Sequence, residues 1–119
     1  MELKNVQDAI RFYIGELKKG RKALQTRADR KAETIGGYER VLAKTIMKLR
    51  NGVEMELDGE RIKDPPATTT ERIARGICFQ AKIDMEQADA EYKNAIEGMR
   101  AIQAELNGWQ SIGRHQDEH

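Results

Sequence analysis

Few side chains in this sequence are able to carry covalent or metal chemistry. The only histidines, His115 and His119, stand four residues apart, a spacing that suits a metal ion when the segment is helical. The segment around them is polar and supplies no third ligand, so we interpret it as a surface tail. The single cysteine, Cys78, has no histidine near it in the sequence, and we interpret it as a buried structural thiol.

The larger patterns that mark an active site are also missing. The sequence has no glycine-rich phosphate loop, no nucleophile with a base at workable spacing, and no zinc or RNA-binding signature. We therefore expect a protein that is not an enzyme and that holds no metal or cofactor.

A basic stretch is the sharpest candidate site, because seven cations between residues 18 and 31 are opposed only by Asp29. Clustered Lys and Arg side chains release counterions when they bind a phosphate backbone, so nucleic acid is one partner that fits. No aromatic residue interleaves the stretch as a platform for bases. We prefer the interpretation that it is a solvated face paired with acidic residues elsewhere in the chain. The candidate nucleic-acid contacts are Lys18, Lys19, Arg21, Lys22, Arg27, Arg30 and Lys31.

Charge is divided unevenly along the chain. Residues 1–50 contain 13 Lys and Arg against 6 Asp and Glu, whereas residues 51–119 contain 8 against 14. The net charge of +1 therefore hides a basic first half and an acidic second half. A lone cysteine and the absence of a long apolar run favour a cytoplasmic protein that does not span a membrane.

Apolar and small residues recur through the second half in alternating steps of four and three. This heptad pattern predicts one long helix, from about residue 68 to residue 112, that packs along another helix. Alternation of small and large residues at the contact allows the two helices to approach closely. The predicted contact positions are Ala74, Cys78, Ala81, Met85, Ala88, Tyr92, Ala95, Met99, Ile102, Leu106, Trp109 and Gly113.

The first half predicts a second long helix, from about residue 3 to residue 50, which the pair Asn51-Gly52 ends. Gly36 and Gly37 together cost this helix roughly 2 kcal/mol of propensity relative to alanine. We expect a break at this pair, and the alternative is that the glycines permit a close helix crossing.

The segment between the two helices predicts a short β-hairpin at about residues 53–63. Apolar and acidic residues alternate before Asp58-Gly59, a favoured two-residue turn. After the hairpin, Thr68 and Glu71 have the spacing of a capping box at the start of the second helix. The polar residues 113–119 are expected to form a frayed tail.

These elements predict one mainly α-helical domain over residues 1–119, built as a long antiparallel helical hairpin or coiled coil with a β-hairpin at its connection. Residue i then lies beside roughly residue 120 − i, which places the basic stretch beside acidic residues of the second helix.

Several apolar residues fall outside the predicted contact seam, and a second copy, forming a four-helix dimer, or another protein partner would cover them. Trp109 is a seam residue that serves equally well as core or as a partner anchor. The candidate partner contacts are Ile73, Ile77, Ile83, Ile96, Trp109 and Ile112.

Two resemblances accompany these patterns. The order helix, β-hairpin, helix resembles the prefoldin-type β subunit, from which the paired Gly36-Gly37 and the alanine-rich seam depart. The segments 38–45, 64–68 and 107–112 are similar in style to small accessory proteins of phages and prophages. The first resemblance implies a holdase chaperone, and the second implies a small protein that binds a host or phage protein, or nucleic acid.

The sequence is therefore compatible with three functions. We expect foremost a non-enzymatic accessory protein that self-associates or binds a protein partner. The alternative is a nucleic-acid-binding accessory protein that uses residues 18–31, and a second alternative is a prefoldin-like holdase.

Overall fold

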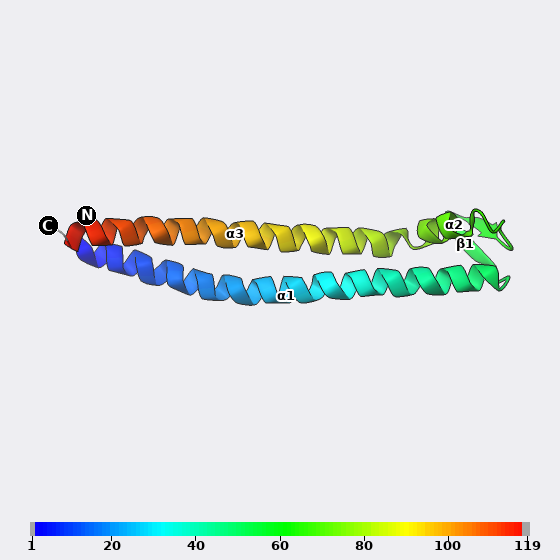
Figure 1. Cartoon of the computed structure of the whole chain (residues 1–119), viewed down its shortest axis with the longest axis horizontal. Helices are drawn as coiled ribbons and strands as arrows, with labels where there is room; N and C mark the ends of the chain where they lie inside the picture. Colours follow the sequence, from blue (N-terminus) through cyan, green and yellow to red (C-terminus); the bar gives the residue numbers. More distant parts are fainter. Residues whose placement is uncertain (1, 118–119) are drawn as a thin grey trace. The chain divides into compact units, whose positions relative to one another are not determined.

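The computed structural model of the protein describes residues 2–117, and five elements follow one another along the chain (Figure 1). They are α1 (Leu3–Arg50), β1 (Met55–Leu57), β2 (Glu60–Ile62), α2 (Thr70–Ile77) and α3 (Phe79–Asp117). The prediction of a mainly α-helical chain, with long helices packed against each other and a short β-hairpin between them, is confirmed.

The contacts of the chain cluster into two compact units. The first, called here the terminal unit, consists of Met1–Asp29 and Ala90–His119, and the second, the hairpin unit, consists of Arg30–Asp89. Helices α1 and α3 each contribute to both units. The expectation of a single domain over residues 1–119 stays a prediction.

In the terminal unit, the first half of α1 packs antiparallel to the second half of α3 (Figure 1). Val6, Leu17 and Leu106 are buried in the seam between the helices. Gly20 lies directly beneath the Sδ atom of Met99, so a small residue receives a large one. This pair confirms the predicted register, in which residue i lies beside about residue 120 − i.

In the hairpin unit, α1 ends as predicted at Asn51-Gly52. Gly52 has a φ of +78°. Its N–H donates to the carbonyl of Leu49 at 3.2 Å, and the N–H of Val53 donates to Lys48 at 3.0 Å. These two bonds form a Schellman motif, which satisfies carbonyls at the helix end and turns the chain toward β1.

The β-hairpin is confirmed, with shorter strands than predicted. Strands β1 and β2 are antiparallel, and Met55 pairs with Ile62. Asp58 and Gly59 have φ values of 49° and 83°, as a two-residue hairpin turn with left-handed backbone requires. The side chain of Leu57 lies against Gly76 of α2, where a Cβ would be 3.3 Å from Leu57 Cδ2. The hairpin therefore packs on α2 through its apolar face.

The predicted break at Gly36-Gly37 is wrong, because α1 is continuous from Leu3 to Arg50. The alternative of a close crossing is also wrong, since a Cβ at either glycine would meet nothing within 4 Å. The propensity cost of two glycines is small beside the packing that orders a helix along its seam.

The predicted single second helix is also wrong in detail. The chain leaves helical geometry at Cys78, with φ −89° and ψ 15°, and so α2 and α3 are separate helices. Hydrogen bonds continue across the break, from Cys78 N–H to the Ala74 carbonyl and from Lys82 N–H to the Cys78 carbonyl. The seam positions before and after Cys78 therefore both keep facing α1, and Ala74 and Ala88 are buried.

Two predictions about the ends of the second helix need correction. No capping box forms, because Thr69 rather than Thr68 is the cap residue and makes no side-chain cap bond. The hydroxyls of Thr69 and Thr70 donate instead to the carbonyl of Pro66. Residues 113–117 continue α3 rather than fraying, and residues 118–119 of the predicted tail lie outside the described residues.

Replacing Gly36 and Gly37 together by Ala should raise the free energy of unfolding by roughly 1.5–2 kcal/mol, because both positions are helical and open. Gly20→Ala is the matched control. Its methyl group would collide with Met99 Sδ, so the gain should be smaller or reversed. Urea unfolding followed by circular dichroism at one protein concentration measures both. A loss of stability in the Gly36, Gly37 variant would contradict a continuous α1.

Candidate functional site

The structure brings only part of the basic stretch into contact with acidic residues of α3. Arg27 Nη1 lies 3.3 Å from Glu91 Oε2 in the terminal unit, and Lys31 Nζ lies 3.0 Å from Asp89 Oδ1 in the hairpin unit. These pairs join residues whose numbers sum to about 120, as the antiparallel register predicts. The preferred interpretation of a paired basic face is therefore correct for Arg27 and Lys31.

The other cations of the stretch also lie on α1, and they differ in their partners. Lys19 pairs within the helix, with Nζ 3.4 Å from Glu16 Oε1. Lys18, Arg21 and Lys22 are exposed, and no carboxylate in the described part of the chain lies within ion-pair distance of their side chains. Arg30 is exposed on α1 in the hairpin unit. Charge pairing within the fold thus explains the basic stretch only in part.

Two of the unpaired cations, Lys18 and Lys22, belong to a longer row on α1 that the pattern of charges in the sequence did not identify. Lys4 and Arg11 are exposed and unpaired in the same way, and they precede Lys18 by 14 and 7 residues. A seven-residue step returns to nearly the same side of a helix. This spacing is the signal in the sequence that could have identified the row.

The predicted partner contacts are divided between the two units. In the hairpin unit, Ile73 and Ile77 are half-buried and Ile83 is exposed. In the terminal unit, Ile96 and Trp109 are half-buried and Ile112 is exposed.

Trp109 borders a hollow on α3 of about 370 Å³. Small residues form its floor, since Ala104 and Gly108 have almost no side chain, and a Cβ at Gly108 would meet nothing within 4 Å. Glu105 and Ile112 complete the lining. The hollow can accept an apolar side chain and presents one carboxylate at its rim.

The most exposed aromatic residue of the terminal unit was missed by sequence reasoning. Phe12 is 59% exposed, and its ring meets that of Tyr13 edge-on at 5.1 Å. It lies outside the contact seam, which is why the heptad pattern did not identify it. Phe12 is about 200° around α1 from Ile10, which points toward α3, so its ring faces solvent on the same unit as the exposed Ile112.

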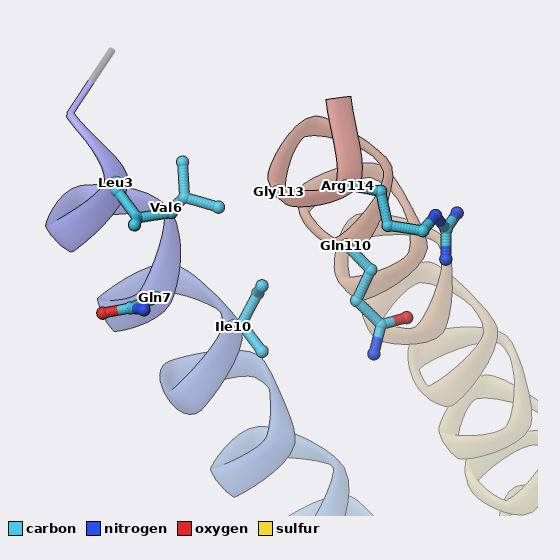
Figure 2. Close-up of a pocket in the computed structure, with 7 residues that line it drawn as sticks. All are labelled: Leu3, Val6, Gln7, Ile10, Gln110, Gly113 and Arg114. Atoms are coloured by element: carbon cyan, nitrogen blue, oxygen red, sulfur yellow. The ribbon is translucent and has the colours of Figure 1, made fainter. Parts of the chain in front are cut away.

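A second hollow, of about 400 Å³, lies at the end of the terminal unit (Figure 2). Val6 and Ile10 point from α1 toward Gly113 of α3, whereas Arg114 points away from α1. A Cβ at Gly113 would lie 3.4 Å from Val6 Cγ1, so glycine at this position allows Val6 to pack closely against α3. Polar side chains also line the hollow, those of Gln7, Gln110 and Arg114.

The metal-ligating side chains of the described residues are dispersed. No set of three His, Cys, Asp or Glu side chains is placed to hold a metal ion there. His115 lies on α3, whereas His119 is outside the described residues. Cys78 is buried, as predicted, and its Sγ lies 3.3 Å from the hydroxyl of Thr45.

Among residues 2–117, none of the helices is long and apolar enough to cross a membrane. A scan of protein families and comparisons with curated proteins and with solved structures found no match to this chain.

The pair Arg27–Glu91 should contribute no more than about 1 kcal/mol to stability, because its side chains are 46% and 44% exposed and water screens the charges. A double-mutant cycle with Arg27→Ala and Glu91→Ala, measured by urea unfolding, gives the coupling energy. Arg75–Glu71, an exposed pair within α2, is the matched control. A coupling well above 1 kcal/mol for Arg27–Glu91 would show that the pair stabilises the fold rather than fixing its register.

Proposed function

We propose that this protein is a non-enzymatic helical interaction protein whose partner is a second copy of itself. The contact would be formed by the edge of the terminal unit that carries Phe12, Trp109 and Ile112. The observation that supports this proposal is the ring of Phe12, which is 59% exposed on the same unit as the apolar hollow beside Trp109.

The small number of buried residues in the terminal unit favours self-association. Within the described part of this unit, only Val6, Leu17 and Leu106 are buried, because each helix has a single helical neighbour. A second pair of helices would form a four-helix bundle and cover one more face of each helix. Burying an exposed Phe side chain contributes up to about 2–3 kcal/mol.

A second copy suits this edge because the edge is proposed to carry both an exposed ring, Phe12, and a hollow that could receive it. In a dimer with a two-fold axis, each copy presents the same surface, so Phe12 of one chain can enter the hollow of the other and the reverse. Charges agree with this arrangement. Glu105 lines the hollow, and Lys19 stands two helical turns from Phe12 on the same face of α1. Across the interface these two side chains would have opposite charge.

Phe12→Asp should weaken the dimer strongly, because the contact would then bury a carboxylate in an apolar hollow. We expect the dissociation constant to rise by roughly 100-fold, equivalent to about 2.7 kcal/mol. Sedimentation velocity over a range of concentrations measures it. Phe79→Asp is the matched control, since Phe79 is 54% exposed in the hairpin unit and should leave the dimer intact.

A second variant separates association from folding. Gly108→Leu places a side chain in open space and favours the helix, yet it fills the hollow. It should give a monomer that is at least as stable as the wild type. A wild-type chain that stays monomeric at high micromolar concentration would refute the proposal, as would an equal loss of association in Phe79→Asp.

The holdase alternative and the resemblance to phage accessory proteins stay predictions. A holdase needs a continuous apolar surface for an unfolded client. Exposed apolar side chains occur in both units, and they include Phe12 in the terminal unit and Val41 and Phe79 in the hairpin unit.

A further inference from the structure

We propose that the solvent face of α1 in the terminal unit binds the phosphate backbone of double-stranded DNA through Lys4, Arg11, Lys18 and Lys22. This surface differs from the predicted stretch 18–31, because it extends toward the start of α1 and leaves out the residues that pair with α3. It is also separate from the edge proposed for the dimer.

The four cations form a row along one side of α1. Lys4, Arg11 and Lys18 each follow a seam-side residue by one position and repeat at seven residues, which aligns them to within a few tens of degrees. Lys22 stands one turn beyond Lys18. At 1.5 Å per residue, the row extends for about 27 Å along a continuous helix.

The charge of this row is available to a ligand. None of the four side chains makes an ion pair or hydrogen bond in the described part of the chain, although Asp8 lies between Lys4 and Arg11. Arg27, by contrast, is held by Glu91. Four unneutralised cations on one face attract a polyanion and release its counterions on binding.

The form of the surface favours a duplex backbone over exposed bases. No aromatic side chain lies in the row, and Phe12 is about 100° around the helix from Arg11. Stacking of single-stranded bases therefore has no platform. Gly15 lies on the same face between Arg11 and Lys18, and nothing stands within 4 Å of where its Cβ would be. The helix backbone can consequently approach a phosphate backbone closely.

The acidic β-hairpin of a second copy is the competing partner, and its size argues against it. Strands β1 and β2 have three residues each. Three residues extend for only about 10 Å, so the hairpin could meet only part of the row. A DNA duplex presents one charge for about every 1.7 Å of its axis and can meet the whole row.

Fluorescence anisotropy with a labelled 20-base-pair duplex of arbitrary sequence tests the proposal across a series of salt concentrations. We expect the logarithm of the association constant to fall with a slope of about −3.6 in the logarithm of salt, which corresponds to four phosphates. Replacing all four cations with Gln keeps helix propensity and should abolish measurable binding at low salt. Each single replacement should reduce the slope by about 0.9.

A control with the same change in net charge distinguishes this face from general attraction. It replaces with Gln four exposed cations near the C-terminal end of α1 in the hairpin unit, Arg40, Lys44, Lys48 and Arg50, and it should bind DNA with an unchanged slope. Equal loss of binding in both variants would overturn the proposal. So would failure of the wild type to bind the duplex at low salt, or a four-Gln variant that loses self-association but not DNA binding.

Discussion

The structure depends on one constraint: in the described part of the terminal unit, α1 and α3 meet along a single seam and have no third helix to pack against. The seam of the terminal unit buries Val6, Leu17 and Leu106 and seats Met99 on Gly20. Every other side of the two helices faces solvent, which explains why the chain is 34% charged and only 5% aromatic. A binding site on this pair of helices must therefore lie on their exposed surface. A large apolar side chain that is exposed there needs an explanation other than packing in the seam.

The parts of the fold that follow from a repeating contact could be predicted from the sequence. The steps of four and three identified the inward positions of α3, and the antiparallel register placed Gly20 beside Met99 and Arg27 beside Glu91. Asp58-Gly59 identified the hairpin turn, because few residues tolerate its backbone. The break at Cys78 could not be predicted in this way, since the contact pattern continues through it and no proline marks it.

The surfaces were less predictable because they do not repeat with the seam. Counting charges located Lys18 and Lys22, but only the structure shows which cations are neutralised by α3 and which remain available. Trp109 was predicted from its seam position, whereas Phe12 lies outside the seam and was missed. The hollow beside Trp109 is lined by residues of α3 alone, so the small residues Ala104 and Gly108 near Trp109 were a signal for it in the sequence.

The claim that a second copy completes the terminal unit is tested most directly at Trp109, the only tryptophan of the chain. Its fluorescence should be measured while the protein concentration is raised from well below to well above the range in which the protein associates. If the edge beside Trp109 is the contact, the emission shifts to shorter wavelength and quenching by acrylamide decreases as the protein associates. An emission that stays constant while sedimentation reports association would place the interface elsewhere and contradict the claim.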